Sequence, residues 1–71
     1  MLTTKYFFYE IRCFIYKLQE DETIEAVQFH AGMLNGMLNF ASDADVISLN
    51  TWLLLYSLIC KVQNKKIKEI S

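Results

Sequence analysis

The side chains of this 71-residue chain that could do covalent or metal chemistry are few and widely spaced. There is one histidine, His30, and the two cysteines, Cys13 and Cys60, form no CxxC pair. A metal centre needs several converging ligands, and nucleophilic catalysis needs a base beside the nucleophile. Asp43 and Asp45 lie in a short polar stretch, where such residues usually cap helices and contact water. The sequence therefore predicts no catalytic residue, no metal site, no cofactor and no small-molecule substrate, and a protein that is not an enzyme.

Apolar residues make up 54% of the chain and aromatic residues 14%. A domain of this size keeps a large share of its surface exposed, so it cannot bury all of these side chains. Some of them are expected to contact another molecule, and a second copy of the chain is the simplest candidate. The sequence predicts a homodimer with these interface residues: Phe7, Phe8, Phe14, Trp52 and Tyr56.

Charge is distributed unevenly along the chain. No lysine or arginine occurs between Lys17 and Lys61, while this stretch contains six acidic residues. The C-terminal segment that follows is rich in lysine. Its four cations are candidates for contact with a nucleic-acid backbone or an acidic partner: Lys61, Lys65, Lys66 and Lys68.

The pattern of apolar residues predicts helices. There is no proline, and the only two glycines are Gly32 and Gly36. Apolar residues recur every three or four positions, and the inner face of the first helix is expected at Phe7, Ile11, Phe14 and Leu18. Thr23 and Ser48 are expected to cap the helices that follow them, and Gly32 is expected to end a helix by supplying a left-handed backbone conformation. The core positions expected in the last helix are Leu49, Trp52, Leu53, Tyr56, Ile59 and Cys60. We expect an all-α fold, a compact four- to five-helix single domain over residues 1–71, with helices at about 3–19, 23–31, 34–41 and 48–66.

The longest apolar run, Trp52–Cys60, has nine residues and is well short of a membrane span. The N-terminal apolar stretch is interrupted by Glu10 and Arg12, which is atypical of a targeting segment. The sequence therefore predicts a cytoplasmic protein with no membrane partner.

The central segment resembles the phage-repressor type (Cro-like) helix-turn-helix domain. The resemblance rests on Thr23-Ile24-Glu25-Ala26-Val27, on a turn at Ala31-Gly32-Met33, on Leu38, and on Ser48-Leu49-Asn50-Thr51-Trp52 with Leu55. It implies a helix that enters the DNA major groove, most commonly in a dimer. It also implies groove-facing residues, and asparagine can pair with adenine there: Asn35, Gly36 and Asn39.

Two functions follow as hypotheses. The first is a small bacterial or phage regulatory protein that binds DNA as a transcriptional regulator with an atypical helix-turn-helix. The alternative is a helical protein-interaction module, such as an antirepressor, an inhibitor or a secretion co-chaperone, that binds a protein and not DNA. The segment from Asp45 to Ile70 resembles helical subunits and co-chaperones of bacterial secretion systems through Tyr56-Ser57 and its lysine-rich end. The acidic middle of the chain favours the alternative, because phosphate neutralisation supplies much of DNA affinity.

Overall fold

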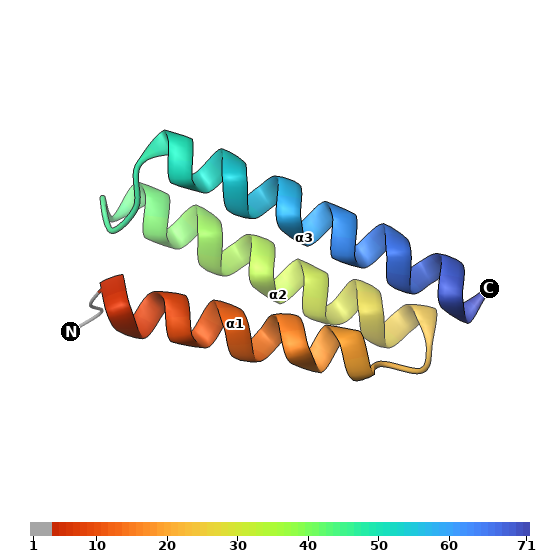
Figure 1. The fold of residues 1–71 in the computed structure, drawn as a ribbon. Coiled ribbons are helices and arrows are strands. Elements are labelled where there is room, and N and C mark those ends of the chain that lie inside the picture. The colour runs from red at the N-terminus through yellow and green to blue at the C-terminus, as the bar shows by residue number, and fades with distance from the viewer. Residues whose placement is uncertain (1–3) are drawn as a thin grey trace.

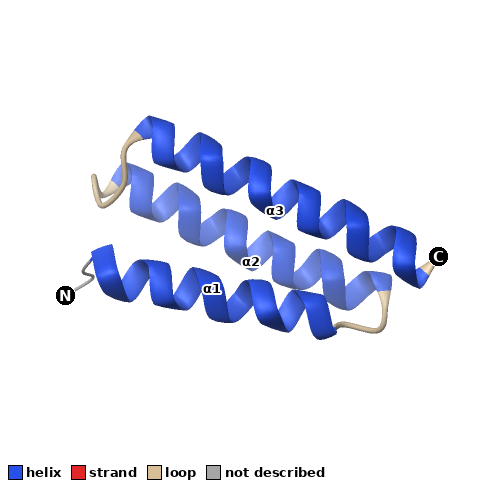
Figure 2. Ribbon diagram, viewed as in Figure 1, coloured by secondary structure: helices blue, strands red, loops and turns tan. Residues whose placement is uncertain are grey.

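The computed structural model describes residues 4–71, which form three α-helices packed side by side. Helix α1 spans Thr4–Glu20, α2 spans Ile24–Asp43 and α3 spans Leu49–Ile70. Figure 1 shows that α2 runs antiparallel to its neighbours, so α1 and α3 run parallel to each other. No strand occurs among residues 4–71 (Figure 2), which confirms the all-α prediction. The bundle measures 37 × 21 × 15 Å.

Helix α1 follows the predicted apolar pattern. Phe7, Ile11 and Leu18 are buried, and Phe14 packs partly against them, which gives spacings of four, three and four. These positions lie on one side of an α-helix, so α1 is amphipathic. The predicted bounds of 3–19 agree with the observed helix, apart from Thr3, which lies outside the described residues.

Helix α2 is the central element of the bundle. Its buried residues recur every three or four positions and face both neighbouring helices: Val27, Ala31, Leu34, Leu38 and Ala41. The Thr23 hydroxyl caps the first turn by accepting a hydrogen bond from the Ala26 backbone N–H at 3.1 Å, as the sequence predicted.

The predicted helix break at Gly32 is wrong. Residues 23–31 and 34–41 were expected to form two helices, but Ile24–Asp43 is one continuous helix that includes Ala31, Gly32 and Met33. Neither glycine has a positive φ. The buried row of α2 continues in register across Gly32, so packing outweighs the helix-breaking tendency of a single glycine, which costs about 1 kcal/mol. Three helices therefore replace the expected four to five.

The C-terminus of α2 is closed by Asp45, which lies two positions after the last helical residue, Asp43. Its φ of 58° is the only positive φ of a non-glycine residue in the described chain. The Val46 N–H donates to the Ala41 carbonyl at 2.8 Å, and the Asp45 N–H donates to the Ser42 carbonyl at 3.1 Å. This pair of hydrogen bonds is the Schellman motif, in which a left-handed residue closes the helix C-terminus.

Helix α3 begins at the predicted cap. The Ser48 hydroxyl accepts from the Thr51 backbone N–H at 3.2 Å. The helix then continues to Ile70, four residues beyond the predicted end at 66. Val62, Ile67 and Ile70 pack partly against the core, which accounts for the extra turn. Only Ile59 of α3 is fully buried. In the described residues, no helix has both the length and the apolar character that crossing a membrane requires.

Replacing Gly32 with alanine tests the continuous α2. A Cβ built at Gly32 meets no atom within 4 Å, and the residue lies in mid-helix. We expect Gly32→Ala to raise the free energy of unfolding by about 1 kcal/mol, because alanine favours the helix more than glycine does. Urea denaturation followed by circular dichroism measures the change. A loss of stability would instead place a turn at Gly32.

Replacing Asp45 with glycine tests the helix end. Asp45 adopts the left-handed conformation that a Cβ disfavours, and its negative charge lies at the C-terminus of α2. We therefore expect Asp45→Gly to raise the free energy of unfolding by up to about 1 kcal/mol. Asp43→Gly is the matched control, since it removes the same charge type from a helical position and should lower stability.

Candidate interaction grooves

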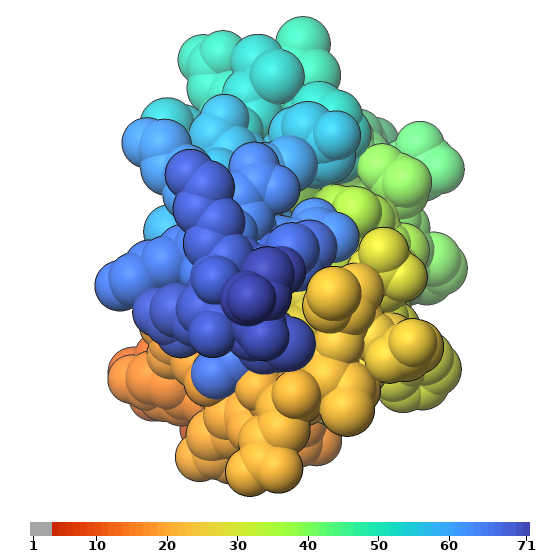
Figure 3. All heavy atoms as spheres, turned by 90° about the vertical axis from the view of Figure 1, so that its right-hand side faces the viewer, coloured from red at the N-terminus to blue at the C-terminus, as the bar shows by residue number. Residues whose placement is uncertain are grey.

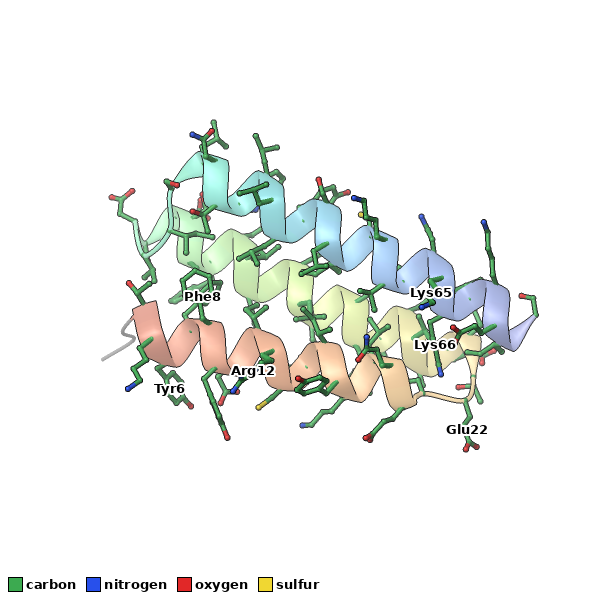
Figure 4. All side chains as sticks on the ribbon, viewed as in Figure 1. Tyr6, Phe8, Arg12, Glu22, Lys65 and Lys66 are labelled. Carbon is green, nitrogen blue, oxygen red and sulfur yellow. The ribbon has the colours of Figure 1, made fainter. Side chains whose placement is uncertain are left out.

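A groove runs between α1 and α3 along the face of the bundle that Figure 4 turns toward the viewer. Its apolar half, which extends along α1 from Phe8 to Gln19 and is bordered on α3 by Leu55 and Leu58, is hollow over about 350 Å³. Apolar residues dominate this half, with Arg12 on one wall. The lining residues are Phe8, Ile11, Arg12, Ile15, Tyr16, Gln19, Leu55 and Leu58. We call this groove, together with the half described next, the α1–α3 groove.

The second half of the α1–α3 groove is lined by lysines. It encloses about 310 Å³ toward the C-termini of α1 and α3. The lining residues are Gln19, Lys61, Val62, Lys65, Lys66 and Glu69. Gln19 lines both halves, so the apolar hollow and the basic hollow adjoin at this residue. Figure 3 shows this end of the bundle, where the last turns of α3 lie against the chain near residues 20–23.

The cations of this groove are only partly neutralised. Lys66 is paired with Glu69 at 3.9 Å on the same helix, whereas no carboxylate of residues 4–71 lies within ion-pair distance of Arg12, Lys61 or Lys65. Figure 4 shows Phe8 and Arg12 toward one end of this face and Lys65 and Lys66 toward the other. The groove is therefore a net positive surface with an apolar floor at one end.

A second groove separates α1 from α2. It encloses about 550 Å³ and is lined mainly by apolar side chains, with Glu10 as its one acidic lining residue. We call it the α1–α2 groove. Its lining residues are Tyr6, Phe7, Glu10, Phe14, Met33, Gly36, Met37 and Phe40.

The contact between α2 and α3 is closer and more polar. The Trp52 indole N–H donates to the Asn39 side-chain oxygen at 3.1 Å. The Trp52 ring stacks on Tyr56 with centroids 5.1 Å apart and an interplanar angle of 3°. These interactions leave Trp52 only partly exposed.

The structure does not bring the predicted DNA-binding residues together. Asn39 binds Trp52, and Asn35 is half-buried with a side-chain oxygen that has no hydrogen-bond partner. Gly36 lines the α1–α2 groove instead. Lys65 is 13 residues beyond Trp52 on α3, a helical rise of about 20 Å from the contact with Asn39. Lys61, Lys65 and Lys66 line the α1–α3 groove, and Lys68 is exposed outside it.

The predicted interface residues divide into three groups. Phe7 is buried in the core, with 2% of its surface exposed, so it offers almost no contact to a partner. Phe14 and Trp52 are half-buried. Phe8 and Tyr56 are exposed, as predicted, and Phe8 lines the α1–α3 groove.

Residues suited to catalysis or metal binding do not converge. His30 Nδ1 lies 2.6 Å from an oxygen of Asp21, in an ion pair or hydrogen bond that joins α2 to the end of α1. Cys13 and Cys60 are free thiols on different helices. Each thiol is hydrogen-bonded to the tyrosine one turn earlier, and this bond raises the pKa of Tyr9 and of Tyr56. No metal-binding group of three His, Cys, Asp or Glu occurs in the part of the chain that the structure describes.

Sequence reasoning missed the grooves for two reasons. The sequence does not predict that Arg12 and the α3 lysines line adjoining hollows, because this depends on α1 and α3 being parallel neighbours (Figure 1). Leu49 and Leu53 were expected in the core but are exposed, as are Leu54 and Leu58. The run Trp52–Cys60 is apolar on every side, so periodicity alone could not identify its buried face.

Replacing the groove cations tests whether these side chains contribute to the stability of the fold. Arg12→Ala, Lys61→Ala and Lys65→Ala should each change the free energy of unfolding by less than about 0.5 kcal/mol, because these exposed groups have no ion-pair partner. Leu34→Ala is the reference for a core loss, and we expect it to cost about 3 kcal/mol. Chemical denaturation of the four variants gives the comparison. A loss above 1 kcal/mol in a cation variant, which is about twice that surface limit, would assign that cation a structural role.

Comparison with known proteins identifies no relative. No family matches the chain, and neither a curated protein nor a solved structure matches it at a significant level.

Proposed function

We propose that this protein is a helical protein-interaction module whose α1–α3 groove binds an acidic amphipathic helix of a partner protein. One observation carries the proposal: an apolar hollow between the parallel helices α1 and α3 adjoins, at Gln19, a hollow lined by lysines of α3. An amphipathic helix lying in a groove contacts it through apolar side chains every three or four residues. The apolar half of the α1–α3 groove suits those side chains.

The charge of the groove specifies the partner. Arg12, Lys61 and Lys65 line it without a carboxylate partner in residues 4–71, so a helix with aspartate or glutamate beside its apolar stripe complements them. Complementary charges raise the association rate and disfavour partners of the wrong sign. The 17-residue α1 is about 25 Å long, which sets the partner segment at about 15 residues.

The proposed module belongs to the class of antirepressors, inhibitors and co-chaperones that act by covering a helix of another protein. Its cellular location in this proposal is the cytoplasm, as the sequence predicts. We also propose that the chain is a homodimer, because thirteen large apolar side chains are exposed in the described residues. The α1–α3 groove accounts for only some of them.

A DNA-binding regulator is the second candidate. The observation that favours it is the gathering of Lys61, Lys65 and Lys68 in two exposed turns of α3, with Arg12 on the neighbouring helix. Lysines in such an arrangement can contact successive phosphates. A mobility-shift assay on a duplex of mixed sequence at low salt tests this candidate, which predicts binding that weakens steeply as salt is added.

Two designed peptides test the primary proposal. Both are amphipathic, about 18 residues long with the same leucine stripe, and one has glutamate and the other lysine beside the stripe. We expect the acidic peptide to bind at least about tenfold more tightly, since a single favourable charge contact of about 1.4 kcal/mol suffices for that factor. Fluorescence anisotropy of the labelled peptides measures both affinities.

Charge reversal locates the binding site. Arg12→Glu combined with Lys65→Glu should abolish or invert the preference between the two peptides. Lys5→Glu combined with Lys68→Glu is the matched control, because it changes the net charge equally at exposed positions that do not line the groove. Equal affinity for both peptides, or equal effects of the two double variants, would contradict the proposal.

A further inference from the structure

The outer face of α2 has an apolar stripe with a symmetrical arrangement. Phe29, Met33, Gly36 and Phe40 follow one another at spacings of four, three and four, so they lie on one side of the helix. Phe29 and Phe40, at the two ends, are 64% and 65% exposed. We call these four residues the α2 stripe. The same spacing is obtained when the stripe is read in either direction.

The two central residues of the stripe, Met33 and Gly36, differ in the size of their side chains. Met33 is 38% exposed, and one turn later Gly36 has no side chain. A Cβ built at Gly36 meets no atom within 4 Å, so the surface is hollow there. This hollow belongs to the α1–α2 groove, which continues past Met37 and Phe40 toward Tyr6.

From this arrangement we propose that two copies of the chain associate through their α2 stripes, in antiparallel orientation about a twofold axis. The axis passes between Met33 and Gly36, so Met33 of each copy enters the hollow above Gly36 of the other. Phe29 of each copy then lies against Phe40 and the open α1–α2 groove of the other. In a twofold interface, if residue i of one copy contacts residue j of the other, then j also contacts i. The palindromic spacing meets this condition.

The surface available suits a weak dimer. An aromatic side chain can bury 150–250 Å², so Phe29, Phe40 and Tyr6 at their observed exposures, with part of Met33, supply about 400 Å² per copy. Twice that area is about 800 Å², which is in the range of weak, transient interfaces that bury less than about 1,200 Å², so the dimer should form only at high protein concentration. A second copy is the favoured occupant, because the twofold axis places Met33 of each copy opposite Gly36 of the other, so the stripe is complementary to itself.

Charge sets a limit on the affinity of the dimer. Glu25 precedes the stripe by one turn and Asp43 follows it by one turn, and α2 contains no lysine or arginine. The antiparallel arrangement brings Glu25 of each copy near Asp43 of the other, so like charges meet at both ends. Asp43→Asn should therefore tighten the dimer by about threefold, since like-charge pairs cost a few tenths of a kcal/mol each.

The proposed dimer does not use the α1–α3 groove, which lies on another side of the bundle and is lined by α1 and α3. A dimer would thus carry two α1–α3 grooves at once. The two proposals can fail separately, because variants of the α2 stripe leave the residues of the α1–α3 groove unchanged.

Exchanging the large and small side chains of Met33 and Gly36 tests the interface. Sedimentation equilibrium of the full chain should show a monomer–dimer equilibrium. Met33→Ala and Gly36→Met should each raise the Kd by about tenfold, the first by removing the inserted side chain and the second by filling the hollow. The double variant Met33→Ala/Gly36→Met restores a side chain opposite a hollow, so its Kd should return to within about threefold of the original.

Two controls test whether a change in Kd arises from a change in fold or from the loss of any exposed apolar side chain. Circular dichroism should show the same helix content in all three variants, because both positions are partly open to solvent and helical. Leu53→Ala removes an apolar side chain of similar exposure from α3, 48% against 38% for Met33, and should leave the Kd unchanged. A chain that stays monomeric at millimolar concentration, single variants with unchanged Kd, or a double variant without recovery would each overturn the proposal.

Discussion

The three helices pack together around one core of buried apolar side chains, and α2 contributes half of these side chains. Of the ten buried residues in the described chain, five lie on α2, and α3 contributes only Ile59. None of the ten is polar or charged. Three short helices can enclose only a narrow core, because surface area grows relative to volume as a domain becomes smaller. The remaining apolar residues must therefore be placed on the outside.

Some of these outer apolar residues line two hollows, and the charged residues of the two hollows differ in sign. α1 takes part in both grooves, but the residues facing α3 include Arg12, whereas those facing α2 include Glu10. α3 brings lysines to one groove, and α2 brings no cation to the other. The two apolar hollows of one small bundle thus differ in electrostatic character, which gives each a different preference among partners.

Sequence reasoning predicted elements where local signals agreed with packing. The Thr23 and Ser48 caps and the buried spacing of Phe7, Ile11 and Leu18 identified the starts of α2 and α3 and the inner face of α1. It failed at Gly32, where a glycine was taken as a helix end although the buried row of α2 continues through it. The end of α2 was predicted at about residue 41, two residues before the observed end at Asp43, whereas the left-handed conformation of Asp45 that closes the helix was not predicted.

The grooves depend on how the three helices pack against one another, which the sequence alone does not predict. Arg12 and Lys65 line the same groove only because α1 and α3 are parallel neighbours, while Asn39 is hydrogen-bonded to Trp52 of α3 and Gly36 lines the α1–α2 groove. The polar contact of Trp52 with Asn39 joins α2 to α3, and α1 is left with a hollow on each side. α1 is therefore the helix that contributes lining residues to both apolar hollows.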